Sequence, residues 1–246
     1  LTHSLTHSLT HSLTKPLAAV LIAALVFVAG STQAATIYYD SFSDTGALNG
    51  STPDTTIGTN TWAATADWQK SGGTVSHVNA VDSGAFLPFT PDTGTVYTLS
   101  ADMTPPTSDK WTAIGFADTN NTTGEFWAND AAPWVLYRRN SNVGSFLGPR
   151  TGGSEDEGDH SGPITLSIVL DTTAAAWTAE WFIDGSSVRG PVAYGTNPTI
   201  NYVGLGSEDT DTGTFDNFTL TEIPEPASAV LLGSAVLGLI CLRRRK

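Results

Sequence analysis

Apolar and polar residues alternate in short runs through residues 35–222, and Gly, Pro, Asn or Asp interrupts each run. Successive side chains of a β-strand point to opposite faces, so a period of two predicts strands, whereas a helix needs a period of about 3.6. Residues 176–185 are the clearest case, because one face would carry Trp177, Ala179, Trp181 and Ile183. The Asp184-Gly185 pair that follows is a strong hairpin-turn signal. The alternation therefore predicts a body made of strands and turns.

We expect nine strands in this body, at residues 37–42, 62–68, 95–102, 111–117, 134–139, 164–170, 177–183, 202–206 and 214–220. Short strands separated by turns favour two packed antiparallel sheets. Composition agrees, because charged residues make up only 14% of the chain, against about 25% in a typical soluble domain. Thr, Ser, Asn and Gly supply the polarity instead. The predicted fold class is all-β, a two-sheet antiparallel jelly-roll sandwich.

Residues 1–34 are predicted to be a repeat followed by a signal peptide. Residues 1–14 repeat Leu-Thr-His-Ser three times and end in Leu-Thr, which we interpret as replication slippage or a start site assigned too far upstream. The alternative is a metal-binding tract through His3, His7 and His11. Lys15, the apolar residues 17–30 and the small residues up to Ala34 form the three parts of an export signal. This order favours a signal peptide, cleaved after Ala34, over the alternative that the apolar residues form a buried core helix.

A second hydrophobic segment lies at residues 227–242, after Pro224-Glu225-Pro226 and before a basic run of Arg243, Arg244, Arg245 and Lys246. A helix of this length spans about 24 Å, less than a hydrocarbon core of about 30 Å, but arginines that snorkel to the surface close the gap. Cationic flanks stay in the cytoplasm, so a transmembrane helix here would place the body outside. Cys241, the single cysteine, lies in this segment. We expect it to be a small buried hydrophobe rather than a lipidation site.

The three parts of this C-terminal segment, in this order, resemble the PEP-CTERM sorting signal of Gram-negative bacteria. The resemblance implies that a membrane exosortase recognises and processes the tail, with Pro224, Glu225 and Pro226 as the sorting motif and the basic run as a stop. An ordinary single-span anchor is the alternative. Two prolines also stop a helix from continuing out of the membrane, which leaves an extended segment for a protease. The predicted domains are residues 1–34, 35–222 and 223–246.

Three segments of the body form a recognisable set: the opening Asp40-Ser41-Phe42, the hairpin around Trp177 and Trp181, and the closing Phe215-Asp216-Asn217-Phe218. Together they resemble the concanavalin A-like lectin/glucanase superfamily, near its laminin G-like branch. The resemblance implies that the opening and closing strands lie near each other and pair. It leaves the activity open, because this fold hosts both binding proteins and hydrolases.

The distribution of charge excludes several classes of function. Five of the 11 basic residues flank the two hydrophobic segments, so residues 35–222 hold six basic against 23 acidic residues, a net charge of -17. Such a body lacks the clustered Lys and Arg that bind nucleic acid. A single cysteine excludes an intrachain disulfide and a cysteine-rich metal site. An exported body without cysteine pairs must be held together by its core alone.

A glucanase of the laminarinase type needs an acid and a nucleophile about 5 Å apart, which would appear as carboxylates alternating on one strand. Only Glu155, Glu157 and Asp159 show this alternation. Their surroundings contain Gly, Ser and Pro without apolar partners, so we expect a solvated acidic loop, with weak Ca²⁺ binding as the alternative to catalysis. His77 and His160 are expected to be surface or loop residues, because no Gly-x-Ser-x-Gly nucleophile motif accompanies them.

Two further groups of residues are candidate sites. Trp127 and Trp134 flank a loop-like stretch near Arg138 and Arg139. Our candidate ligand contacts are Trp127, Trp134 and Arg138, with the tryptophans stacking on a sugar ring. Most large aromatics fill cores instead, as we expect for Trp177 and Trp181. The second group is a structural Ca²⁺ site built from Asp216 with the acidic turn of Glu208, Asp209 and Asp211. A backbone hydrogen bond that Asp216 accepts at the strand edge is the simpler explanation of that residue.

These observations lead to a non-enzymatic hypothesis. We expect an exported protein, anchored in the inner membrane before processing and then located at the cell surface or in the extracellular matrix. Its partners would be the exosortase, the membrane through the C-terminal helix, and an exopolysaccharide or other glycan, but not nucleic acid. No cofactor is certain, and Ca²⁺ is the one candidate. A glycoside hydrolase on the same fold and a purely structural matrix protein are the alternatives.

Overall fold

The structure is a computed structural model that describes residues 33–79, 81–107, 110–139, 142–149, 154–208 and 213–224. Its elements in chain order are β1 (Ala35–Asp40), β2 (Gly46–Ala47), β3 (Thr55–Thr56), β4 (Trp68–Ser71), β5 (Thr74–His77), β6 (Ser83–Pro88), β7 (Thr95–Thr104), β8 (Trp111–Ala117), the 3-10 helix η1 (Phe126–Asn129), β9 (Trp134–Arg138), β10 (Asn142–Phe146), β11 (Ser154–Asp159), β12 (Ile164–Asp171), β13 (Thr178–Ile183), β14 (Ser186–Ala193), β15 (Tyr202–Ser207) and β16 (Thr214–Pro224). The predicted all-β class is confirmed.

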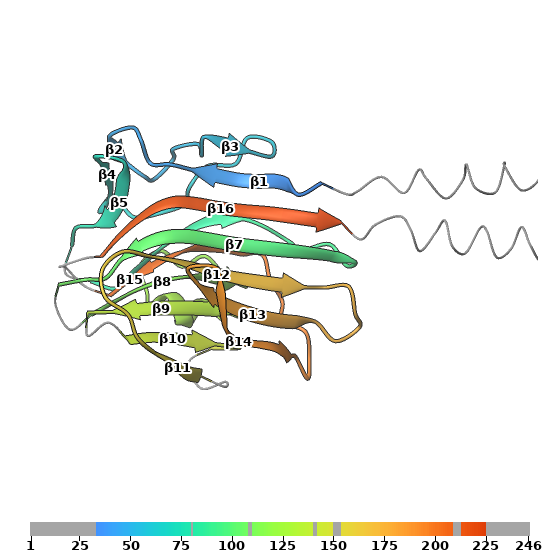
Figure 1. Ribbon diagram of the computed structural model, residues 1–246. Coiled ribbons are helices and arrows are strands. Elements are labelled where there is room, and N and C mark those ends of the chain that lie inside the picture. Colours follow the sequence, from blue (N-terminus) through green and yellow to red (C-terminus); the bar gives the residue numbers. More distant parts are fainter. Residues whose placement is uncertain are drawn as a thin grey trace, which may run out of the picture. The chain divides into compact units, whose positions relative to one another are not determined.

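Two antiparallel sheets form the molecule (Figure 1). Sheet A has the order β14-β13-β12-β7-β16-β5-β4-β2, and β1 pairs with both β16 and β3 at its side. Sheet B has the order β11-β10-β9-β8-β15-β6. Chain neighbours such as β12 and β13 pair as hairpins, whereas β16 lies beside β7 across a long sequence separation. The two-sheet sandwich expected from the alternation is thus confirmed.

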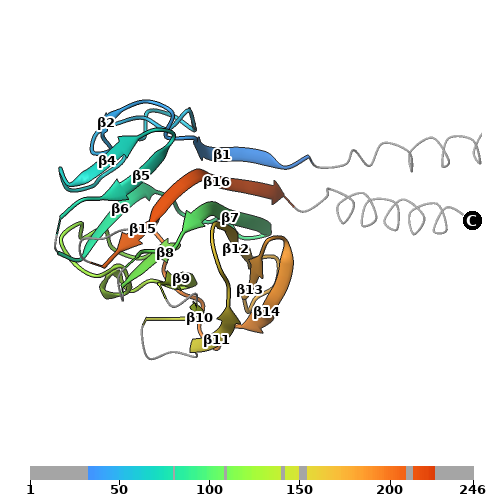
Figure 2. The ribbon, with the colours of Figure 1, turned by 60° about the vertical axis from the view of Figure 1, so that its left-hand side comes forward.

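The opening and closing strands lie side by side, as Figure 2 shows for β1 and β16. Tyr38 pairs with Leu220, and Asp40 pairs with Phe218. This confirms the pairing that the superfamily resemblance implies. Asn217 has a φ of 50°, and the register of β16 shifts between Asp216 and Thr219. The bulge at this point accounts for two adjacent polar residues in the middle of a strand.

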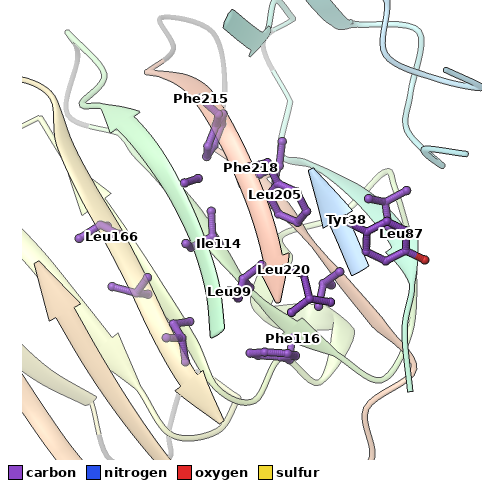
Figure 3. Close-up of a cluster of buried hydrophobic side chains, with 14 of the residues drawn as sticks. Tyr38, Leu87, Leu99, Ile114, Phe116, Leu166, Leu205, Phe215, Phe218 and Leu220 are labelled. Carbon is purple, nitrogen blue, oxygen red and sulfur yellow. The ribbon is translucent and has the colours of Figure 1, made fainter. Parts of the chain in front are cut away.

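The main core fills the space between the sheets, where alternate residues of each strand face inward. Figure 3 shows part of it, with Leu99, Leu166 and Leu220 from sheet A opposite Ile114, Phe116 and Leu205 from sheet B. Each of these side chains is fully buried, which contributes about 1.5–3 kcal/mol for a residue of this size. Residues 35–222 contain no cysteine, so packing rather than a disulfide holds the sheets together.

The prediction of a strand at residues 62–68 is wrong. This segment has only an isolated bridge between Ala63 and Phe86, and the strand β4 begins where the prediction ends, at Trp68. Trp62 and Trp68 are both buried, and their indole N–H groups donate hydrogen bonds to Asp40 and Ser83, respectively. Trp62 is therefore buried from a loop packed into the core, whereas Trp68 is buried at the start of β4.

Several strands were not predicted, namely β2, β3, β5, β6, β10, β11 and β14. The most consequential is β11, where the sequence indicated an exposed acidic loop. Backbone pairing of Ser145 with Glu155 and of Gly144 with Asp156 makes this segment the edge strand of sheet B. An edge strand pairs on one side only and needs little apolar surface, so it leaves a weak hydrophobic pattern.

In the described part of the chain, no helix is long and apolar enough to cross a bilayer. The predicted signal peptide and the predicted helix at residues 227–242 lie outside the described residues, as do Glu225, Pro226 and the basic run from Arg243 to Lys246.

Candidate functional site

A second hydrophobic cluster covers the face of sheet B that points away from sheet A. It arises because neighbouring residues of a strand face opposite ways: Val135 and Tyr137 of β9 belong to the main core, whereas Trp134 and Leu136 belong to this second cluster. The other members are Phe86, Trp111, Ala113, Ala117, Phe126, Ala131 and Phe146. Most outer faces of antiparallel sheets are polar, so this aromatic face is a candidate site.

Trp134 is the centre of the cluster. Its ring stacks on Phe146 with centroids 4.0 Å apart and an interplanar angle of 13°, and Trp111 lies 6.3 Å away on another side. Its Nε1 donates a 3.1 Å hydrogen bond to the carbonyl of Gly148. The neighbouring strand leaves room through Gly115, where a Cβ would lie 2.4 Å from the Cβ of Trp134. These contacts fix the ring as a floor that is only 1% exposed.

Trp127 is positioned by η1, which packs over the same face. The buried side chain of Asn129 holds this segment, since its Oδ1 accepts from the Asn121 N–H at 2.6 Å and its Nδ2 donates to the carbonyls of Asn121 and Glu125 at 3.3 Å. Asp130 adopts a left-handed conformation, with φ 51°, and ends the helix. Trp127 is half-buried and packs against the cluster. It is therefore more accessible than Trp134.

A pocket of about 540 Å³ opens over this floor. Its lining residues are Trp111, Glu125, Trp127, Trp134, Leu136, Arg138, Asn142, Gly144, Phe146, Glu155, Asp156 and Glu208. The structure thus brings together all three residues that the sequence indicated as ligand contacts, namely Trp127, Trp134 and Arg138. Its size falls within the range of about 300–1,000 Å³ that is usual for small-molecule sites.

The polar wall of the pocket is a connected set of side chains on β9, β10 and β11. Nη1 of Arg138 donates to Oδ1 of Asn142 at 3.2 Å, and Nδ2 of Asn142 donates to Oδ1 of Asp156. The N–H of Gly158 also donates to that oxygen, at 2.9 Å. This wall could not be predicted from sequence, because Asn142 and Asp156 meet Arg138 only through strand pairing.

The acidic alternation at Glu155, Glu157 and Asp159 is split by the fold. Glu155 lines the pocket and its Oε1 lies 3.6 Å from Nε of Arg189. Glu157 instead accepts a hydrogen bond from the hydroxyl of Ser145. A register shift in the pairing of β10 with β11 accompanies this change of direction. Of the three carboxylates, Glu155 is the one that lines the pocket.

Arg189 anchors this edge of the sandwich. It is buried, its guanidinium lies 4.8 Å from the ring centroid of Trp181, and its Nη1 donates to the carbonyl and hydroxyl of Ser145 at 3.0 Å. Trp181 is buried as predicted, while Trp177 is partly buried against the main core.

The residues of the predicted Ca²⁺ site are only partly described. Asp209 and Asp211 lie outside the described residues, and Glu208 lies at the pocket, 3.9 Å from Nζ of Lys110. Oδ1 of Asp216 accepts a 2.6 Å hydrogen bond from the N–H of Asn217. Burial, and then the charge of Asp102, raise the pKa of Asp216. Within the described ranges, no three His, Cys, Asp or Glu side chains are grouped as metal ligands.

The two histidines of the body differ from each other. The prediction of a surface position is wrong for His77, which is fully buried on β5 with its ring 5.5 Å from that of Trp68. His160 follows β11, as a half-buried loop residue, and its carbonyl accepts a 3.1 Å hydrogen bond from Tyr137.

Comparison with known proteins adds two findings. Residues 222–246 match the PEP-CTERM protein-sorting motif. The fold is similar to that of an endo-1,3-beta-glucanase from Streptomyces sioyaensis, with 12% identity and a TM-score of 0.52 over 78% of this chain and 97% of that chain. It is also similar to a Trypanosoma rangeli sialidase, with 15% identity and a TM-score of 0.54 over 75% of this chain and 30% of that chain. A search of curated proteins finds no match.

These similarities, at 12% and 15% identity, concern the fold alone. The matched region spans less than a third of the sialidase, whereas it spans nearly all of the glucanase. Together with the strand order and the matched tail, they show that this chain carries a PEP-CTERM protein-sorting motif at residues 222–246 and has a two-sheet β-sandwich fold similar to that of the glucanase.

Proposed function

We propose that this protein is an exported cell-envelope or extracellular-matrix protein of a Gram-negative bacterium and that its β-sandwich binds a glycan. The match of residues 222–246 to a protein-sorting motif supports sorting and processing by an exosortase. A signal peptide in residues 1–34 and a transmembrane helix at residues 227–242 complete the export route in this proposal. The inner membrane would hold the chain until its tail is processed.

The pocket on sheet B is the observation that carries the proposal of glycan binding. Its accessible aromatic ring is that of the half-buried Trp127, which packs against a cluster that includes the buried Trp134 and Phe146, and its polar wall consists of hydrogen-bonding groups from Arg138 and Asn142. Aromatic rings offer flat apolar surfaces, and polar groups beside them can bond hydroxyls. Sugar rings present an apolar face and a rim of hydroxyls, so this arrangement suits them.

A glycoside hydrolase is the second candidate, because Glu125, Glu155, Asp156 and Glu208 line the same pocket. Cleavage needs two carboxyl groups on opposite sides of one glycosidic bond. We favour binding without cleavage, since Glu155 pairs with Arg189 and Asp156 accepts hydrogen bonds from Asn142 and Gly158. A purely structural matrix protein is the remaining alternative.

A glycan array probed with the purified full-length chain, with and without Ca²⁺, tests the proposal. We expect binding to a restricted set of glycans. Replacing Trp127 by Ala should weaken it about tenfold or more, because a tryptophan anchor typically contributes about 2 kcal/mol. Trp127→Phe keeps an aromatic face and should retain most of the affinity.

Three outcomes decide between the candidates. Binding that Trp127→Ala abolishes supports the pocket, provided that the variant unfolds at the same denaturant concentration as the wild type. Release of reducing sugar from a bound glycan would show that the protein is a glycoside hydrolase rather than a binding protein. If no glycan on the array is bound, both glycan binding and glycan hydrolysis are contradicted. A structural matrix protein is then the remaining candidate.

A further inference from the structure

The charges around the pocket indicate what kind of glycan fits it. Four acidic residues are among those that line it, Glu125, Glu155, Asp156 and Glu208, against one basic residue, Arg138. The whole body is acidic as well, with six basic against 23 acidic residues over residues 35–222. A cleft lined by one sign of charge attracts ligands of the opposite sign and repels those of the same sign. Glycans rich in carboxylate or sulfate are therefore poor ligands.

Glu208 and Glu155 each lie near a cationic side chain. Glu208 lies 3.9 Å from Lys110, and Glu155 lies 3.6 Å from Arg189. The side chain of Glu155 is 62% exposed, and exposed ion pairs are weak, with a median of about 0–1 kcal/mol. The ion pair with Arg189 therefore leaves much of the Glu155 side chain exposed.

Asp156 differs because its hydrogen bonds come from neutral groups, the amide of Asn142 and the N–H of Gly158. Both bonds hold the carboxylate in place without neutralising its charge. Arg138 donates from Nη1 to the same Asn142 amide. Asp156 therefore lines the same pocket as Trp134 and Phe146, with its carboxylate held by these two hydrogen bonds.

We infer that the bound glycan carries free amino groups, an inference that rests on the proposed glycan binding. A protonated sugar amine donates charge-assisted hydrogen bonds to carboxylates, which are stronger than those between neutral groups. The ring of Trp127 beside them favours a cation as well, through the negative face of its π-system. An amino sugar thus matches both the aromatic surface and the charge of the carboxylates, whereas the hydroxyls of a neutral sugar form only hydrogen bonds without a matching charge.

A second concavity extends the site and suits a polymer rather than a single sugar. It is lined by Val81, Asp82, Lys110, Thr123, Gly124, Glu125 and Glu208. Glu125 and Glu208 are therefore shared by the two cavities. Asp82 adds a carboxylate to this second cavity, so successive amino sugars of a chain would meet acidic groups in both.

Titration calorimetry on the full-length chain tests the inference with two probes that differ only in their amines. One is the hexamer of β-1,4-linked glucosamine and the other is the same hexamer fully N-acetylated. At a pH where the amines are protonated, we expect the free-amine hexamer to bind more tightly, and its affinity to fall as salt is added. Asp156→Asn and Glu155→Gln should each weaken it by about two- to fivefold.

Asp92→Asn is the matched control, since Asp92 is exposed and lines neither cavity. If Asp92→Asn weakens binding of the free-amine hexamer as much as Asp156→Asn and Glu155→Gln do, the attraction to this acidic protein is non-specific. That result would overturn the inference. Equal or tighter binding of the acetylated hexamer would also overturn it, while leaving glycan binding intact. If neither hexamer and no arrayed glycan binds, the proposed function fails together with the inference.

Discussion

Nε1 of Trp62 donates a 2.8 Å hydrogen bond to Oδ2 of Asp40 in the interior of the sandwich. The other oxygen of this carboxylate accepts from the N–H of Phe42 at 2.9 Å, and Phe42 has a φ of 48°. The ring of Trp62 in turn lies 5.0 Å from that of Phe218 on β16. One buried carboxylate therefore connects the opening segment of the body with its closing strand.

Replacing Asp40 by Ala is expected to lower the free energy of unfolding by about 2–4 kcal/mol, because two buried donors lose their acceptor. Chemical denaturation measures this change. Ser41→Ala is the control, since the hydroxyl of Ser41 bonds the exposed carboxylate of Asp54, and we expect a change of no more than about 0.5 kcal/mol there. Equal effects of the two substitutions would contradict a special role for Asp40.

The same carboxylate should make stability depend on pH. Burial raises the pKa of Asp40, more than its two hydrogen bonds lower it. A raised pKa in the folded state means that the native protein holds this proton more tightly than the unfolded chain. The stability that this tighter proton binding gives is therefore fully present below the pKa of Asp40 in the unfolded chain, about 3.9. It is lost as the pH rises through the pKa of Asp40 in the folded protein.

Denaturation of the wild type and of Asp40→Asn at a series of pH values isolates this contribution. The unfolding free energy of the variant must be subtracted from that of the wild type, because other carboxylates also make stability depend on pH. The pKa of Asp216 is raised as well, whereas hydrogen bonds from Ser41 lower the pKa of Asp54. We expect the difference in unfolding free energy, wild type minus variant, to fall as pH rises above about 4 and then to become flat. A difference that is constant with pH would show that the pKa of Asp40 is not shifted.

Gly115 should be intolerant of even a single methyl group. A Cβ there would lie 2.4 Å from the Cβ of Trp134 and 2.8 Å from the carbonyl oxygen of Pro133, and such overpacking typically costs about 1–3 kcal/mol. Gly115→Ala is thus expected to destabilise the protein and to change the tryptophan fluorescence. Gly195→Ala is the control, because nothing lies within 4 Å of its Cβ position. Similar denaturation midpoints for both variants would contradict the tight packing.

Much of the fold could be predicted from the sequence where one face of a strand is buried. Strands β12 and β13 alternate because Leu166 and Trp181 face the core while Ser167 and Glu180 face outward. The alternation of apolar and polar residues does not predict a strand where side chains are buried for another reason. Within residues 62–68, Trp62 is buried from a loop and Trp68 is the first residue of β4, so the apolar pattern does not correspond to one strand.

The candidate site was only partly predictable. Trp127, Trp134 and Arg138 are close in sequence, so their proximity could be expected. Trp111 and Asp156 reach the same pocket through the pairing of β8 with β9 and of β10 with β11. No local pattern encodes that register. The acidic strand β11 is held by backbone pairing with β10, so its residues carry little hydrophobic signal.

The folded body and the matched sorting motif overlap at the end of β16. Glu222, the first residue of the matched region, pairs with Ala35 of β1, and Pro224, the last residue of β16, pairs with Thr95. Proline has no N–H, so it cannot donate to a strand ladder. The last strand therefore ends where the Pro224-Glu225-Pro226 triplet begins.

Replacing Pro224, Glu225 and Pro226 by Ala should leave export intact and block processing of the tail. The physical reason is that alanine removes the restriction to extended backbone and allows a helix to continue toward the body. Immunoblots of membrane and extracellular fractions, with the mass of the product, measure the outcome. Pro198→Ala, in the loop before β15, is the control and should be processed normally. Unchanged processing of the triple variant would remove the sorting role of this motif.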